Sequence, residues 1–547
     1  MEISPPAGKS ELLFFEPRPT QVQMIQGSWI DVRPMQSLET SGPLTFRLPA
    51  SSEMVVDLAR TFLYLRCKIV LKDGSTAKRP PPTTDSVQKL RNALTTATAS
   101  RAIADTELTL ARETLVTATA TLATATQAYN TEKNDSNKTV RDDAQNAKDT
   151  GSLNVTAKIT AGTKAKAAED KAQLAVTVAD KASTSNDPDY RVAPVANFLH
   201  SLFSSVDLSL NGRSIVSSGG NYAYKSYITT LLSANRDAIN SQYESALFYP
   251  DDPKVFDTDE SIFTKNSGLL KRYNYTYGSQ EFEVMDILNI DLANQEKLLI
   301  PGVGLILSLR KNDPKFCLMS FEPGMEFRVD ITEAILYVRQ VEISPSLLIE
   351  TERRLQTDTA KYYFQRVEVN VLPLSVNSTV INEANLSLAS PALPNRIVIG
   401  IVETEAHLGS YALNPFKFQL HNLNTINFVF NGQSMPYRMI PYAADKSQWL
   451  MGFYSLFSQT GLLNHPMGSS WVSRDNWLNG YALMVFDSTP DGVVGEHLQV
   501  SRGGVLNLEM RFSQPLAKNA SVIMLSSYDS YLQITGDRSI VANYTLG

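Results

Sequence analysis

Two short sequences far apart in the chain share one pattern: LSLNGRS at residues 208–214 and FVFNGQS at residues 428–434. In both, a β-prone run is followed by Asn-Gly, the pair that favours a type I′ turn between two antiparallel strands. The turn residues are Asn211 and Gly212 in the first sequence and Asn431 and Gly432 in the second. The match predicts two β-hairpins of the same design.

Further matches follow each hairpin in the same order. LSLR at residues 307–310 corresponds to LEMR at 508–511, and each follows a glycine-containing turn. An aromatic stretch that reads as a helix follows each Asn-Gly turn, at residues 221–233 and 449–463. One Asn-Gly match could easily arise by chance. A series of matches in the same order, separated by similar numbers of residues, is less easily explained by chance. We therefore expect two copies of one β domain.

Most of the chain has the pattern of short strands. Runs of Val, Ile, Leu, Phe and Tyr, such as residues 61–71, 396–402 and 506–512, are separated by Pro, Gly, Asn and Asp. Many short strands separated by turns favour a sandwich or barrel over alternating β and α units. The predicted fold is mainly β, with two tandem jelly-roll β-sandwiches (a double jelly roll) and a long α-helical hairpin inserted in the first.

The insertion spans residues 86–187 and differs sharply in composition. It is rich in Ala, Thr, Lys and Asp, and Tyr129 is its only aromatic residue before position 187. Apolar residues recur at the alternating spacing of a heptad seam. The first seam comprises Leu108, Ala111, Leu115, Ala118, Leu122, Ala125 and Tyr129. The second comprises Ala161, Ala165, Ala168, Ala172, Ala175, Ala179 and Ala182.

These two seams predict two helices that fold back as an antiparallel hairpin, with a polar, turn-rich connection at residues 130–152. The alternative is a disordered low-complexity loop, because Thr is a poor helix former. The expected domain organisation is an N-terminal arm at 1–19, a first jelly roll at 20–345 with 86–187 as a surface spike, and a second jelly roll at 346–547.

Composition excludes several classes of protein. The chain has 547 residues, 43% of them hydrophobic and 19% charged, which is an ordinary globular balance. Its formal net charge of −6 argues against a protein that mainly grips nucleic acid. Two cysteines, Cys67 and Cys317, exclude a disulfide scaffold and fit a reducing compartment. We see no secretory signal and no apolar run long enough to cross a membrane.

No catalytic or metal-binding pattern emerges. The five histidines have no metal-ligand spacing, and neither a G-x-S-x-G elbow nor a P-loop occurs. The acidic segment 251–260 could bind a cation, but its Pro and Lys break the spacing of an EF-hand, which favours a solvated loop. Trp471 and Trp477 could stack on sugars, although core positions are favoured. We assign no catalytic residue, no cofactor and no metal.

Several stretches resemble a known family. They are TQVQMIQGSW at 20–29, NFLHSLFSSVDLSLNG at 197–212, AILYVRQVEISPS at 334–346, NPFKFQLHNLNTINFVFNG at 414–432, FYSLFSQTGLL at 453–463 and NGYALMVFDSTP at 479–490. The chain resembles the double jelly-roll major capsid proteins of Polinton (Maverick) elements and adintoviruses, and more remotely virophage proteins and adenovirus-lineage hexons. The insertion departs from the family's short connection at that place.

The resemblance implies a structural viral protein and no enzyme. A homotrimer would form a pseudo-hexagonal capsomer and tile an icosahedral shell, with penton and minor capsid proteins as further partners and no specific nucleic acid. It would be assembled inside the host cell and reside in the virion, with the helical arm as a candidate contact to a host surface. The alternatives are a minor capsid or penton protein, a carbohydrate-binding jelly-roll protein, and an enzyme whose site forms only in three dimensions.

Overall fold

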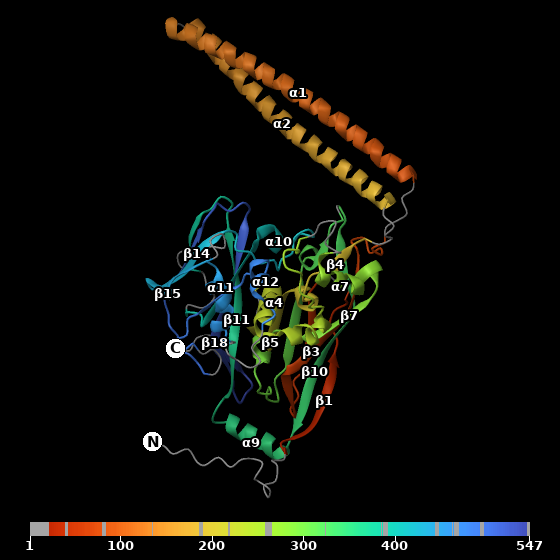
Figure 1. Ribbon diagram of the computed structural model, residues 1–547, viewed down its shortest axis with the longest axis vertical. Helices are drawn as coiled ribbons and strands as arrows, with labels where there is room; N and C mark the ends of the chain where they lie inside the picture. Colours follow the sequence, from red (N-terminus) through yellow and green to blue (C-terminus); the bar gives the residue numbers. More distant parts are fainter. Residues whose placement is uncertain are drawn as a thin grey trace. The chain divides into compact units, whose positions relative to one another are not determined.

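The computed structural model describes the chain except residues 1–20, 39–41, 79–83, 134, 185–189, 217–218, 258–264, 323, 384–385, 387–391, 443–447, 462, 464–469, 493–496 and 544–547. The predicted arm at 1–19 lies outside the described residues. Two compact units make up the molecule (Figure 1). One comprises residues 1–74, 192–321 and 327–547, and the other comprises 75–191 with 322–326.

Two antiparallel sheets form the first sandwich, with strand orders β1-β10-β3-β7 and β2-β8-β5-β6. The strands of the first sheet are β1 (Met24–Val32), β10 (Phe327–Ile343), β3 (Met54–Leu71) and β7 (Phe282–Ile287). Those of the second are β2 (Leu44–Leu48), β8 (Leu305–Lys311), β5 (Phe203–Leu210) and β6 (Arg213–Val216). A short pair, β4 (Val192–Pro194) and β9 (Leu318–Ser320), lies apart from both sheets.

The second sandwich repeats this arrangement, with strand orders β11-β18-β13-β16 and β12-β17-β14-β15. Its first sheet contains β11 (Ala360–Leu374), β18 (Ala520–Ile534), β13 (Arg396–Glu403) and β16 (Met484–Asp487), with β19 (Ile540–Asn543) paired to β18. Its second sheet contains β12 (Val380–Glu383), β17 (Leu506–Phe512), β14 (Leu423–Phe430) and β15 (Gln433–Pro441). The eight strands correspond one to one in chain order with those of the first sandwich. The predicted pair of jelly rolls is confirmed.

Alternation along β3 shows why these segments form half-buried strands. Leu63, Leu65, Cys67 and Ile69 are each fully buried, and the residues between them are only partly buried. Successive side chains of a strand point to opposite faces, so this period of two gives the sheet one core face and one outer face.

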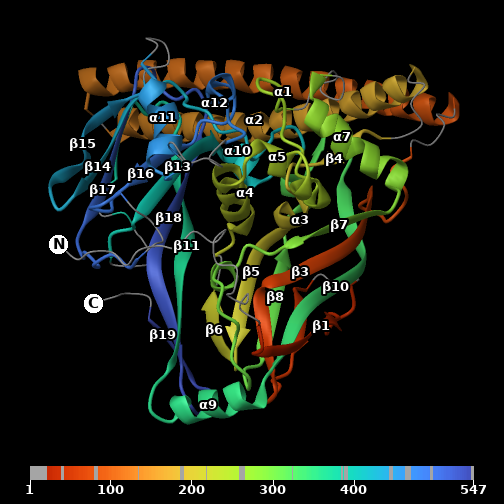
Figure 2. The ribbon, with the colours of Figure 1, turned by 60° about the horizontal axis from the view of Figure 1, so that its bottom comes forward.

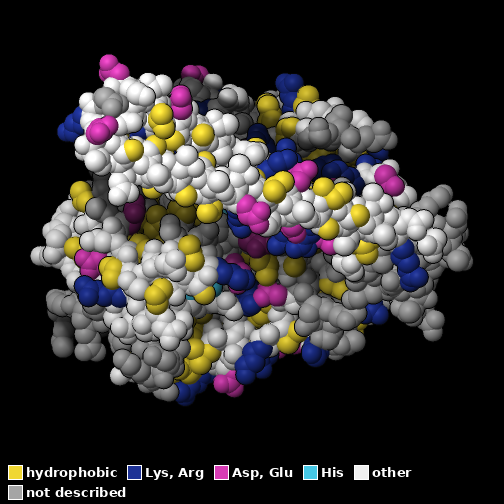
Figure 3. Space-filling model, turned by 90° about the horizontal axis from the view of Figure 1, so that it is seen from above, with side chains coloured by type: hydrophobic (Ala, Val, Ile, Leu, Met, Phe, Trp, Pro, Cys, Tyr) yellow, Lys and Arg dark blue, Asp and Glu magenta, His cyan; other side chains and the backbone are white. Residues whose placement is uncertain are grey.

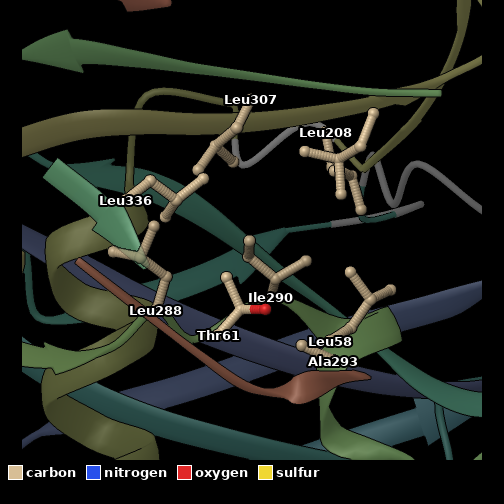
Figure 4. Close-up of a pocket in the computed structure, with 9 residues that line it drawn as sticks. Leu58, Thr61, Leu208, Leu288, Ile290, Ala293, Leu307 and Leu336 are labelled. Atoms are coloured by element: carbon tan, nitrogen blue, oxygen red, sulfur yellow. The ribbon is translucent and has the colours of Figure 1, made fainter. Parts of the chain in front are cut away.

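The core of the first sandwich closes around a small apolar cavity of about 20 Å³. Figure 4 shows Leu336 and Leu58 of the first sheet facing Leu208 and Leu307 of the second across this space. The side chains that meet here therefore come from strands far apart in the sequence, as expected for two sheets packed face to face.

Short helices fill the connections between strands. In the first sandwich they are α3 (Phe198–Ser201), α4 (Tyr222–Ser233), α5 (Arg236–Ile239), η2 (Gln242–Ala246), α7 (Ser267–Thr276), η3 (Tyr277–Ser279), η4 (Asp291–Asn294) and α8 (Pro314–Cys317). In the second they are α10 (Thr404–Leu408), α11 (Leu450–Ser458) and α12 (Arg474–Leu478). Figure 2 shows α9 (Pro345–Leu355) at the end shared by the two sandwiches, between β10 and β11.

The other unit is the predicted helical hairpin, formed by α1 (Thr84–Thr131) and α2 (Asp135–Thr184). The expected turn-rich connection at 130–152 is wrong, because α2 already begins at Asp135. A Cβ atom added to Gly151 would lie 3.3 Å from Leu115 Cδ1, so the two helices stay in contact through this polar stretch. Within the described residues, no helix is long and apolar enough to cross a membrane.

Threonine is accommodated in these helices by local hydrogen bonds. Thr106 donates its hydroxyl to the Ala102 carbonyl at 2.8 Å, and Thr119 donates to that of Leu115 at 2.8 Å. Such bonds to the preceding turn satisfy the hydroxyl without an outside partner. This explains how a Thr-rich sequence forms long helices despite its low intrinsic propensity.

Candidate assembly interfaces

Both Asn-Gly pairs form tight turns that hold their hairpins to a neighbouring strand. The backbone φ angles are positive at Asn211 (46°), Gly212 (80°), Asn431 (49°) and Gly432 (83°). Positive φ at both central residues is the property of a type I′ turn. The Asn211 side-chain oxygen accepts the Gly304 N–H at 2.8 Å, and that of Asn431 accepts the Val505 N–H at 3.0 Å. The two copies thus share a specific tertiary contact.

The first of these hairpins also contacts the second sandwich. The Asn211 side-chain amide donates to the Arg538 carbonyl at 3.0 Å, and Arg213 donates to the Ile540 carbonyl at 2.6 Å. In return, Arg538 donates from Nε to the Pro301 carbonyl at 2.7 Å. These bonds join the two sandwiches near the turn between β18 and β19.

Helix α4 forms a second junction through its aromatic face. The ring of Tyr227 stacks on Phe416 of the second sandwich with centroids 4.1 Å apart and planes at 4°. Tyr224 meets the same phenylalanine edge-on at 5.7 Å. All three side chains are buried. Aromatic pairs of this kind stabilise beyond their area, so α4 belongs as much to the junction as to the first sandwich.

A buried ionic network crosses the same junction. Arg272 and Asp251 of the first sandwich are fully buried and form an ion pair at 2.5 Å. Asp251 also accepts the side-chain amides of Asn266 and, from the second sandwich, Asn414, both at 2.9 Å. The predicted solvated loop at 251–260 is therefore wrong at Asp251, because its carboxylate has protein partners instead of water.

The edge of β11 is covered by the first sandwich. The backbone N–H of Val367, on this outermost strand, donates to Asp291 at 3.2 Å. Asp291 forms an ion pair with Lys225 at 2.6 Å, and both side chains are 2% exposed. A bare strand edge would be open to pairing with another chain. The contact removes that liability and joins the two sandwiches at a third place.

The outer face of the sheet β1-β10-β3-β7 is unusually apolar for an uncovered surface. Trp29 is 50% exposed, and its ring lies 5.1 Å from that of Phe62, which in turn stacks on Tyr337 at 5.0 Å. Met285 and Ile287 on β7 are also exposed. Outer faces of antiparallel sheets are normally polar, and contiguous apolar patches mark interaction surfaces. We call these five residues the aromatic face.

Charged groups border the aromatic face. Arg66 forms ion pairs with Glu283 at 2.8 Å and with Glu333 at 3.5 Å, and the Tyr64 hydroxyl donates to Glu283 at 2.8 Å. These bonds lower the pKa of Glu283, with the bond from Arg66 as the main cause. An apolar centre with a paired, polar rim is the usual anatomy of a protein–protein interface.

In the hairpin, the first predicted seam lies along the side of α1 that packs on α2. Ala111 and Ala125 are buried. The other five predicted positions are half-buried, at Leu108, Leu115, Ala118, Leu122 and Tyr129. Positions outside this stripe, such as Leu110 and Val116, are exposed. On the side of the hairpin that Figure 3 shows, most atoms belong to the backbone or to uncharged polar side chains, with hydrophobic and charged side chains scattered among them.

The second predicted seam differs from the contact stripe of α2. Ala172 is half-buried, but Ala168 is exposed, and the side chains of Ala175 and Ala179 lie outside those described. Of the other predicted members, Ala165 is half-buried and Ala161 is exposed, whereas Gly162 and Glu169, which lie outside the predicted seam, are half-buried. Glu169 pairs with Arg101 of α1 at 2.6 Å, so a charged residue takes a seam position where the sequence suggested alanine.

Catalytic chemistry has little support among the described residues. No group of three or more His, Cys, Asp or Glu side chains there is placed to hold a metal ion. Burial raises the pKa of Cys317 to about 12 and that of Cys67 further, which suppresses thiolate chemistry. Trp477 is fully buried in the core, and its ring nitrogen donates to the Leu483 carbonyl at 2.8 Å.

These features define a double jelly roll with joined sandwiches and an apolar outer face. A chain of the Sputnik virophage, solved by cryo-EM, has this fold: the TM-score is 0.56 at 10% identity, over 99% of this chain and 93% of that one. The mavirus major capsid protein is similar at a TM-score of 0.47 and 9% identity, over 99% and 94% of the two chains.

Comparisons of sequence are less informative. The Caenorhabditis elegans protein named "Uncharacterized protein F54H12.2" is 21% identical over 300 residues, which is 54% of this chain and 69% of that protein. No family model matches the chain. The likeness to known proteins therefore establishes the fold.

Proposed function

We propose that the protein is the major capsid protein of a virus or virus-like element, with a structural and not an enzymatic role. The observation that carries this proposal is the fold shared with a chain of the Sputnik virophage over 99% of the sequence. The joined sandwiches and the exposed aromatic face support it, because a shell subunit needs a fixed shape and surfaces that bind other copies.

In this proposal three copies form a pseudo-hexagonal capsomer, and capsomers tile an icosahedral shell together with penton and minor capsid proteins. The protein is then a component of the virion and is assembled inside the host cell. The two jelly rolls at 20–345 and 346–547 together supply six sandwiches to each trimer. The hairpin, within 86–187, serves as an outward spike that contacts the host surface.

The finer assignment is to the Polinton (Maverick) and adintovirus lineage. It rests on the resembling stretches at 197–212 and 414–432, which contain both Asn-Gly turns. The structure of an adintovirus shell protein would test it. We expect its TM-score against this chain to exceed the 0.56 of the Sputnik chain, and a lower value would remove the lineage while leaving the capsid role.

Negative-stain electron microscopy and light scattering of the purified protein test the capsid role. We expect pseudo-hexagonal particles with three times the 60.4 kDa mass of the chain, or closed shells. Isolated monomers would contradict the proposal. Trp29→Ser combined with Ile287→Ser should weaken association, whereas Leu408→Ser, at a side chain that is 73% exposed elsewhere, is the matched control.

Deleting residues 86–187 tests the role of the hairpin separately. The hairpin is a compact unit apart from the sandwiches, so we expect the shortened protein to keep its trimers on light scattering and to lose the part of host-cell attachment that the hairpin provides. Monomers of the deletion variant would mean that the hairpin is an assembly element instead of a spike.

A further inference from the structure

A polar cleft of about 610 Å³ opens in the first sandwich between α4, η2 and the segment that follows β7. From α4 it is lined by Ser226, Thr229, Thr230 and Ser233. These positions are three and four residues apart, so one face of the helix presents four hydroxyl side chains. The volume lies within the range of small-molecule sites. The aromatic side of the same helix packs on the second sandwich.

A chain of hydrogen bonds beneath the cleft fixes its walls. His200, which is 2% exposed, contacts the Tyr222 hydroxyl through Nδ1 at 2.8 Å and Asp286 through Nε2 at 3.2 Å. The Tyr222 hydroxyl accepts the backbone N–H of Asn289 at 3.0 Å, so its proton is free to donate to Nδ1. Nε2 then carries the imidazole proton and donates it to the Asp286 carboxylate.

This chain orients two groups that line the cleft, Asp286 and Asn289. Buried hydrogen bonds of this kind hold a binding group in place before a ligand arrives. The second oxygen of Asp286 accepts the Ile287 N–H at 2.7 Å, which fixes the carboxylate further.

Other polar side chains line the cleft. They include Thr229, Thr230 and Gln242, of which Thr230 is only 7% exposed. Polar groups so placed are available to a ligand or to water. The ring of Tyr243 and the side chain of Leu288 add apolar surface to the same walls.

The charge of the cleft limits the class of ligand. Among the described residues that line it, Asp286 and Glu296 are acidic and none is Lys or Arg. Without a cation the cleft disfavours phosphate, sulfate and sialic acid. Hydroxyl, amide and carboxylate groups beside an aromatic ring match a neutral sugar, whose hydroxyls need hydrogen-bond partners and whose C–H face is apolar.

We propose that this cleft binds neutral oligosaccharides. Asp286 and Asn289 hydrogen-bond the sugar hydroxyls from one wall, Thr229 and Thr230 do so from α4, and Tyr243 contacts the apolar face of the sugar. The cleft borders the aromatic face, with which it shares Ile287, and it gives the protein a means of attachment in addition to the helical hairpin.

The full-length protein, in whatever assembly it forms, is first applied to an array of neutral, sialylated and sulfated glycans. We expect binding of neutral glycans, in competition with the same free oligosaccharide, which shows that the sugar and not its carrier is bound. The strongest neutral glycan is then titrated by calorimetry against the wild type and variants. Binding of no neutral glycan, or a preference for charged ones, would overturn the proposal.

Asp286→Asn and Thr230→Val keep the shape of each side chain while changing its hydrogen bonding. Each should weaken binding by about tenfold or more, the effect of one lost hydrogen bond in a formed site. Asp475→Asn on the exposed surface of α12 is the matched control. Thr229→Val, at a half-buried hydroxyl, covers the case in which Asp286→Asn fails to fold. If Thr229→Val and Thr230→Val both bind the glycan as tightly as the wild type, the proposed site is refuted. The capsid role is tested separately, by the particles seen in electron microscopy.

Discussion

The buried pair of Asp251 and Arg272 gives the most demanding test of how the two sandwiches are joined. Asp251→Ala removes the ion pair and the two amide bonds from Asn266 and Asn414. Breaking one partner of a buried pair typically costs about 3–5 kcal/mol, because the other charge stays buried. Arg272 keeps its bonds to the carbonyls of Pro194 and Tyr249, so we expect a loss of about 3 kcal/mol.

Urea denaturation followed by tryptophan fluorescence measures this loss, since Trp477 on α12 of the second sandwich is fully buried. The midpoint should fall with little change in the slope, because the folded and unfolded surfaces stay similar. Glu350→Ala is the control: it breaks exposed pairs with Arg353 and Arg354 on α9 and should leave the midpoint in place. A midpoint for Asp251→Ala equal to that of the control would refute the reasoning.

Three further predictions concern the core, pH and the thiols. Leu307→Ala, beside the apolar cavity, should cost about 2–5 kcal/mol in the same urea assay, and a loss below about 1 would mean that the site collapses around the change. Burial lowers the pKa values of His407 and His421, so the unfolded chain takes up protons first as the pH falls through about 6.5. Stability should therefore decrease from about pH 7 to 5, and replacing both histidines by Gln should flatten that slope. Cys67 and Cys317 should react with a thiol reagent only on unfolding, and rapid reaction of the native protein would contradict their burial.

The hairpin turns were predictable because they depend on local geometry. Asn and Gly are the residues that tolerate positive φ, so their position in the sequence fixes the turn without knowledge of its surroundings. Because the same Asn-Gly pair occurs twice, it also predicted that the two halves of the chain have the same strand order. Two similar sheets, each with Asn-Gly between the same two strands, follow from one duplicated pattern.

The residues of α2 that contact α1 were predictable only in part, because the position of α1 decides which side of α2 is buried. Alanine marks a position where close approach is allowed, but glycine and paired charges allow it too. Gly162 and Glu169 are half-buried, although the neighbouring alanines, Ala161 and Ala168, were the predicted contact positions. The ion pair with Arg101 holds Glu169 in this position. A sequence pattern on one helix cannot identify which side the other helix will cover.

The functional side chains that could not be predicted from the sequence are those whose hydrogen-bond partners are far away along the chain. Asp251 and Asn414 are bonded across the two sandwiches, and Asp286 is fixed by a histidine from an earlier helix. Nothing in a window of a few residues distinguishes such a carboxylate from a solvated one. Only the folded arrangement of α4 and the β7 segment brings the cleft groups together.

The two halves share one strand order but differ in their surfaces. Helices α4 and α11 follow equivalent hairpins, yet α4 is buried at the junction while Leu450, Met451 and Tyr454 of α11 are about half exposed. The second sandwich covers α4, but the described part of the chain has no third sandwich that could cover α11. In the proposed trimer, the first sandwich of the next copy would occupy that place, and its aromatic face supplies an apolar surface of the kind required. Since a closed ring needs two different surfaces on each copy, the exposed α11 and the aromatic face are a more suitable pair than either surface with itself.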